Sequence, residues 1–149
     1  MNNENDIIKM LDALKKNDVL CSLDFKNDIL KLISTNAKGF IKKFYHDMIR
    51  KNYNQLNRFE VLKLNRKQRN ELNRNDLYRY EYRSNSNLRC IFTIVNVNNI
   101  EKVILLCAFN EDGNKTKGKN SYKDNIERAI RIYFNIVKKE ENKNGTWLW

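Results

Sequence analysis

The stretch Leu77-Tyr78-Arg79-Tyr80-Glu81-Tyr82-Arg83 alternates aromatic and charged side chains. Because successive side chains of a β-strand point to opposite faces, this pattern predicts a strand with its tyrosines on one face and its charges on the other. Two apolar stretches follow it, residues 88–97 and 103–109, and Asn98-Asn99 joins them. We therefore expect a three-stranded antiparallel meander over residues 77–109, with the three tyrosines facing a layer of helices.

Apolar residues recur at helical spacing in four segments outside the meander, residues 4–16, 25–34, 38–54 and 121–139. Residues 18–24 alternate and predict a short first strand, whereas residues 57–76 are polar and poorly periodic and are interpreted as a long connection. The resulting order is strand, two helices, three strands and helix, with an extra helix at the N-terminus. This order indicates an α+β fold, in which the helices pack on one face of a small, mainly antiparallel sheet and leave the other face open.

The length of 149 residues fits a single domain. We divide it into an N-terminal helical extension (1–17), a core (18–139) and a tail (140–149) that ends in Trp147-Leu148-Trp149. Burial of the two tryptophans predicts that the tail docks, either on the N-terminal helix or on a partner. The chain has no apolar run of membrane-spanning length, and its polar start argues against a secretory signal peptide. We therefore expect a cytoplasmic protein without membrane contact.

The chain is strongly basic, with 29 Lys and Arg against 18 Asp and Glu and a net charge of +11. Such a balance is typical of proteins that bind a polyanion, above all a nucleic acid. A genome rich in Lys and Asn codons would give part of the same charge without any binding function. The basic residues concentrate in segments 57–90 and 113–143, on either side of the apolar segment 91–112.

The residue types that hold metals are sparse. Cys21, Cys90 and Cys107 lie in apolar stretches without the spacing of a zinc site, so we expect buried, reduced thiols. The single histidine, His46, lies in a helical pattern and has no histidine partner. The sequence therefore predicts neither a metal site nor a cofactor.

The turn after the first meander strand decides which charges share a face. A three-residue turn, Asn85-Ser86-Asn87, would pair Arg83 with Arg89, whereas a four-residue turn would put Arg89 among the tyrosines, where burial of a charge is costly. We therefore expect one charged face, made of Arg79, Glu81, Arg83 and Arg89. This face is either a solvated, partly paired surface or a phosphate-binding face, since arginine offers two parallel donors to phosphate oxygens.

The loop after the last strand adds to the second interpretation. Lys115, Lys117 and Lys119 supply three ammonium groups beside the same sheet edge. Tyr122 follows the loop, where its ring could stack on a base.

Three stretches together resemble the RelE/ParE-like toxins of bacterial toxin–antitoxin modules, including the HigB-type members. They are Cys21-Ser22-Leu23-Asp24-Phe25 at the first strand, residues 77–83 with 87–92 at the strand pair, and residues 103–109 with the Lys-rich loop, Tyr122 and Ile126-Glu127-Arg128-Ala129 at the end. The resemblance covers residues 18–137 and lies in the order and spacing of these stretches.

The resemblance implies a cytoplasmic toxin that is neutralised by a cognate antitoxin. Many members of the family cut mRNA on the ribosome without a metal ion, by attack of a 2′-hydroxyl on the adjacent phosphate. Such a reaction needs a base, cations for the developing charge and an acid for the leaving oxygen. In this resemblance Arg79 and Arg89 match basic positions of the family's cleft. Under the hypothesis of a nuclease we expect these two arginines to stabilise charge, Glu81 to act as general base and Tyr122 to stack on or orient a base. The RNA-binding candidates are Arg83, Lys115, Lys117 and Lys119.

Some positions depart from the family. Glu81 stands in place of a lysine in the most similar ribosome-dependent nuclease, and Asn110-Glu111 in place of a common Lys-Arg pair. The alternatives are a toxin of the same fold that inhibits a protein target such as gyrase, and a non-toxic RNA-binding or mobile-element protein.

Overall fold

The computed structural model describes residues 3–32, 37–50, 59–82, 87–111 and 121–142. Its helices and strands form an α+β arrangement. In chain order they are α1 (Asn3–Lys15), β1 (Val19–Cys21), α2 (Leu23–Leu32), α3 (Ala37–Arg50), β2 (Phe59–Val61), α4 (Arg66–Glu71), β3 (Leu77–Glu81), β4 (Leu88–Val97), β5 (Ile100–Asn110) and α5 (Tyr122–Asn142). The tail ending in Trp147-Leu148-Trp149 lies outside the described residues, so its predicted docking stays a prediction. None of the helices in the described ranges is long and apolar enough to cross a membrane.

The five strands form one mixed sheet in the order β1-β5-β4-β3-β2. The meander of β3, β4 and β5 is antiparallel, as predicted, and β1 pairs in parallel with β5. Asn98 and Asn99, with φ of 53° and 67°, make the tight turn between β4 and β5, a conformation that asparagine tolerates well.

Residues 57–76 are not the featureless connection that we expected. Phe59–Val61 pairs with β3 as an edge strand, and Arg66–Glu71 forms α4. The helix begins at a capping box in which the Asn65 side chain accepts from the Gln68 N–H at 2.8 Å and the Gln68 side chain accepts from the Asn65 N–H at 2.9 Å. Leu72, fully buried, anchors the segment in the core below α5.

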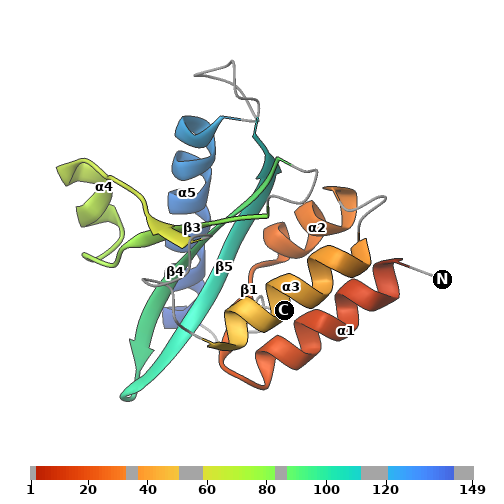
Figure 1. Ribbon diagram of the computed structural model, residues 1–149. Coiled ribbons are helices and arrows are strands. Elements are labelled where there is room, and N and C mark those ends of the chain that lie inside the picture. The colour runs from red at the N-terminus through yellow and green to blue at the C-terminus, as the bar shows by residue number, and fades with distance from the viewer. Residues whose placement is uncertain (1–2, 33–36, 51–58, 83–86, 112–120, 143–149) are drawn as a thin grey trace.

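Helices cover both faces of the sheet, with α1, α2 and α3 on one side and α5 on the other (Figure 1). The prediction of an open second face is therefore wrong. The reason lies in β5, where every residue of 103–109 is buried, as in strands that are covered on both faces. The tyrosines face the side of α1–α3 as predicted: Tyr80 and Tyr82 pack edge-on against Phe44 and Phe40, and Tyr78 stacks on Phe92 of the same face.

The register between β3 and β4 differs from the expected one by two residues. Glu81, not Arg83, pairs with Arg89. Because the side chains of a strand alternate with a period of two, this shift leaves the predicted face unchanged. Arg79, Glu81 and Arg89 therefore share one face, and it is the face that α5 covers.

A β-bulge in β5 sets the side chains at the far end of this strand. Ile91 pairs with Cys107, but the next residue of β4, Phe92, pairs with Leu105, so that Leu106 is the extra residue. Leu106 and Cys107 consequently face the same side, toward α5, and the alternation continues from there in the opposite phase. Phe109 thereby lies on the face of α5, opposite Arg89.

Candidate functional site

Six ionisable side chains, two of them from β3, meet on the face of the sheet that α5 covers, at the N-terminal end of this helix. We call them the Glu81 cluster: Glu60 on β2, Arg79 and Glu81 on β3, Arg89 on β4, Glu111 after β5, and Tyr122 at the start of α5. The sheet register accounts for the meeting, because Glu60 pairs with Arg79 and Glu81 pairs with Arg89 across adjacent strands.

One oxygen is the centre of the cluster. Glu81 Oε2 lies 2.9 Å from Arg79 Nη1 and 3.3 Å from Arg89 Nε, and it accepts a hydrogen bond of 3.3 Å from the Tyr122 hydroxyl. The Glu81 side chain is only 8% exposed, so these charge-assisted contacts form away from bulk water. Two guanidinium groups and a phenol are thus held around one carboxylate.

Each arginine also has a carboxylate of its own. Arg79 pairs with Glu60, and Arg89 Nε lies 3.1 Å from Glu111 Oε1. These outer carboxylates are more accessible than the central one, with side-chain exposures of 62% for Glu60 and 30% for Glu111. The cluster therefore has a buried centre and an accessible rim.

Two neighbouring side chains fix the ring of Tyr122. Its ring meets that of Phe109 edge-on at 5.1 Å, and the guanidinium carbon of Arg79 lies 5.4 Å from its centroid. Burial, and then the charge of Glu81, raise the pKa of the Tyr122 hydroxyl above its ordinary value, although Arg79 opposes them. Tyr122 therefore stays protonated at neutral pH and acts as a hydrogen-bond donor.

The structure brings together all four residues that the sequence placed as catalytic, Arg79, Glu81, Arg89 and Tyr122. The four RNA-binding candidates lie outside the described residues: Arg83, Lys115, Lys117 and Lys119. Two described residues that adjoin these segments are in contact, since the Glu111 N–H donates to the Asn87 carbonyl at 2.9 Å. Sequence reasoning missed Glu60 altogether and treated Glu111 only as a departure from the family.

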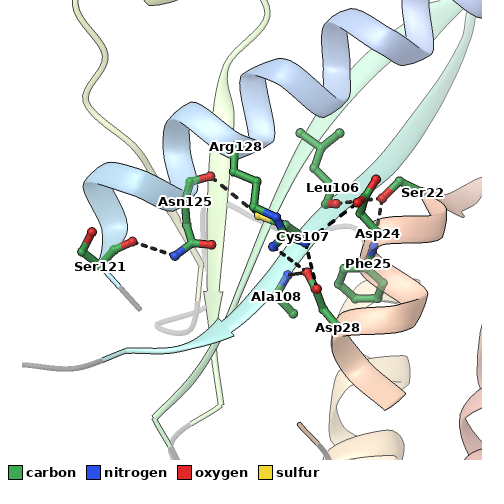
Figure 2. A network of polar contacts seen from close by, with 10 residues as sticks. All are labelled: Ser22, Asp24, Phe25, Asp28, Leu106, Cys107, Ala108, Ser121, Asn125 and Arg128. Atoms are coloured by element: carbon green, nitrogen blue, oxygen red, sulfur yellow. Dashed lines mark hydrogen bonds and ion pairs between the residues drawn. The ribbon is translucent and has the colours of Figure 1, made fainter. Parts of the chain in front are cut away.

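A second polar network joins α5 to α2 and β5 (Figure 2). Both guanidinium nitrogens of Arg128 bind Asp28 of α2, Nη1 to Oδ2 at 2.8 Å and Nη2 to Oδ1 at 2.8 Å. Asp28 Oδ2 also accepts from the Ala108 N–H of β5 at 3.0 Å. We call this the Asp28–Arg128 pair, and it ties α2, β5 and α5 together.

The position of this pair follows from the short length of β1. The pairing of β1 with β5 ends at Cys21 and Leu105, and beyond it this edge of β5 pairs with no other strand in the described part of the chain. Side chains of the next segment replace that partner: the Ser22 hydroxyl donates to the Leu106 carbonyl at 2.7 Å, and Asp28 receives the Ala108 N–H. The contacts satisfy backbone groups that would otherwise be buried unpaired, which is a structural role.

A cavity of about 420 Å³ lies beside the Asp28–Arg128 pair, between α2 and α5. Its wall includes Lys31 and Arg131 as well as the apolar Leu32 and Phe109. The described residues hold no group of three or more His, Cys, Asp and Glu side chains arranged to bind a metal ion.

The remaining nucleophile candidates are remote from the Glu81 cluster or inert. All three cysteines are buried and free, and burial raises the pKa of Cys21 and of Cys107 to about 12. Such thiols stay protonated at neutral pH and react slowly. His46 is exposed on α3, which packs on the opposite face of the sheet.

Comparisons of the chain with protein-family models, with curated proteins and with solved structures find no match.

Proposed function

We propose that this chain is the toxin of a type II toxin–antitoxin module and cleaves mRNA on the ribosome at the Glu81 cluster. The observation that carries the proposal is the convergence of Arg79, Glu81, Arg89 and Tyr122, the four residues that reasoning from the sequence named as catalytic candidates. The net charge of +11 supports a polyanionic substrate. The proposal includes a cytoplasmic location and a cognate antitoxin as partner.

The order of elements is compatible with this proposal. When α1, β2 and α4 are set aside, the chain runs through a strand, two helices, three antiparallel strands and a helix. The RelE/ParE-like resemblance implies this same order for residues 18–137. Fold alone does not define an activity, so the proposal depends on the cluster.

The chemistry assigns one task to each group of the cluster. Glu81 accepts the proton of the 2′-hydroxyl as the 2′-oxygen bonds to phosphorus and the bond from phosphorus to the 5′-oxygen breaks. Arg79 and Arg89 stabilise the negative charge that develops on the phosphate oxygens. The departing 5′-oxygen takes a proton from solvent, and the products are a 2′,3′-cyclic phosphate and a 5′-hydroxyl. Tyr122 orients Glu81 through its hydrogen bond and offers its ring to a base.

Induced expression with mapping of mRNA 5′ ends tests the proposal. We expect growth arrest, new 5′-hydroxyl ends, and loss of both effects in the Glu81→Gln variant. Glu127→Gln is the matched control, because Glu127 is exposed on α5 and changes the charge equally. New ends that persist in Glu81→Gln, in protein whose circular dichroism matches wild type, would contradict the assignment.

One observation favours a second candidate, a toxin or RNA-binding protein without nuclease activity. Both arginines of the cluster are already paired with carboxylates of the chain, Glu60, Glu81 and Glu111. A site of this kind could serve as a rigid recognition surface for a protein target. The same expression experiment separates the two candidates, since growth arrest with intact mRNA supports the second one.

A further inference from the structure

We propose that Glu60 and Glu111 form a specificity gate over the Glu81 cluster, in which two displaceable carboxylates occupy the arginines where an RNA phosphate binds. The inference rests on the proposed function, because it takes a phosphodiester as the ligand of the cluster. It concerns which polyanions enter the site rather than how the bond breaks.

The exposures of the three carboxylates separate a fixed one from two movable ones. Glu81 is 8% exposed and holds both arginines, whereas Glu111 is 30% and Glu60 62% exposed. Glu60 lies on the three-residue edge strand β2, and Glu111 lies directly after the end of β5. Each outer side chain can therefore turn into solvent while the buried centre keeps its contacts.

The arginines remain oriented when the outer carboxylates leave. Arg79 Nη1 and Arg89 Nε both contact Glu81 Oε2, so the two guanidinium groups are neighbours that one phosphate could bridge. Phosphate oxygens match a guanidinium group in the same way as a carboxylate does, with parallel donors and an opposite charge. A phosphodiester can thus take the places of Glu60 and Glu111 without rearranging the centre.

While Glu60 and Glu111 contact the arginines, the charge of the Glu81 cluster favours some polyanions over others. Among the described residues, three carboxylates face two guanidinium groups, so a phosphate that approaches these side chains meets one more negative charge than positive. Repulsion between like charges in an interface is unfavourable and is a common means of excluding wrong partners. A polyanion that contacts only the cluster is then rejected. An RNA that is held by further contacts of this basic chain can displace the two carboxylates.

Binding of an uncleavable RNA tests the gate separately from catalysis. The probe is a single-stranded oligoribonucleotide with a 2′-O-methyl group at every position, which lacks the attacking hydroxyl. We expect the double variant Glu60→Gln with Glu111→Gln to bind this probe at least about tenfold more tightly than wild type. The double variant Glu71→Gln with Glu127→Gln is the matched control, because it removes the same charge from the groove between α4 and α5.

Equal affinities of the gate variant and the control variant would overturn the gate, whatever the cleavage activity. Tighter binding by the gate variant alone supports it, even where the wild-type protein cleaves no RNA, so the nuclease proposal can fail independently. The single variant Glu111→Gln, compared with Glu127→Gln, gives the same decision if the double variant does not fold. An Arg89→Gln change added to the gate variant should return the affinity to that of the control or below it.

Discussion

Two arginine–carboxylate sites lie at the N-terminal half of α5, and they are built differently. In the Asp28–Arg128 pair one guanidinium group binds both oxygens of one carboxylate, and the exposed Asp24 lies farther away, at 4.0 Å. In the Glu81 cluster two guanidinium groups share one buried oxygen, and each has a further, more exposed carboxylate. The first site also holds a backbone N–H of β5, that of Ala108.

The difference separates a structural contact from a functional candidate. In the Asp28–Arg128 pair both short contacts of Arg128 go to the one carboxylate that also holds a backbone N–H, and loss of that carboxylate would leave a strand edge without its acceptor. In the Glu81 cluster each arginine has two carboxylates at hydrogen-bonding distance, so one of them can be exchanged while the other stays. The number and exposure of the partners of an arginine therefore tell more about its role than the presence of an ion pair.

The largest effect on stability is expected at the Asp28–Arg128 pair. Asp28→Ala removes the carboxylate that binds Arg128 and accepts from the Ala108 N–H, and it should lower the free energy of unfolding by about 3 kcal/mol. Urea denaturation of the purified protein measures this loss. Asp24→Ala is the control on the same helix: Asp24 is 56% exposed and 4.0 Å from Arg128, so its removal should cost less than about 0.5 kcal/mol.

A smaller effect is expected at the centre of the cluster. Glu81→Gln removes the shared charge, but Arg79 keeps Glu60 and Arg89 keeps Glu111, so the free energy of unfolding should fall by about 1–2 kcal/mol. The proposed cleavage should fall at least about 100-fold, since the variant has lost its base. If Glu81→Gln lost more free energy of unfolding than Asp28→Ala, the Glu81 cluster would have a structural role like that of the Asp28–Arg128 pair.

The pH dependence of the free energy of unfolding reports on the buried thiol of Cys107, which lies beside the Asp28–Arg128 pair. Burial raises the pKa of Cys107 from 9.0 to about 12, so the unfolded chain loses this proton first and stability falls as pH rises from about 9 to about 12. Cys107→Ala should reduce the slope of the unfolding free energy in this range, by at most about 1.4 kcal/mol per pH unit. Urea midpoints at several values between pH 8 and 11 give both slopes, and equal slopes would contradict the burial argument.

The smallest effect is expected at the rim of the cluster. Glu60→Gln and Glu111→Gln each remove one accessible partner from an arginine that keeps Glu81, so each should change the free energy of unfolding by less than about 1 kcal/mol. The Glu127→Gln variant sets the baseline for an exposed glutamate in the same measurement. A rim variant that is as unstable as Asp28→Ala would erase the distinction between the two sites.

The faces of the three tyrosines and of Arg79, Glu81 and Arg89 were predictable from the sequence, but the register and the β-bulge in β5 were not. Alternation over residues 77–83 fixed which side chains lie together, and a shift of two residues does not alter a pattern with a period of two. The assumed turn length was wrong, so Glu81 rather than Arg83 pairs with Arg89. The unbroken apolar run 103–109 already indicated a strand covered on both faces, which the prediction of an open face overlooked.

The short elements and the long-range contacts had weaker signals. The spacing of Asn65 and Gln68 fits a capping box and could have indicated α4, whereas a three-residue strand such as β2 has too few positions to show a period. Glu60 was missed for that reason. Asp28 and Arg128 are 100 positions apart, and no local pattern links them.

The β-bulge at Leu106 lets β5 carry one residue more than the strand beside it without changing which of the paired side chains face α5. Loss of Leu106 would leave Ile91 opposite Cys107 and Phe92 opposite Leu105 in a regular ladder, so Phe109 would stay opposite Arg89. Such a deletion removes one buried side chain from the core below α5. Loss of a residue between Cys107 and Phe109 would instead exchange the faces of the residues beyond it and carry Phe109 away from Tyr122.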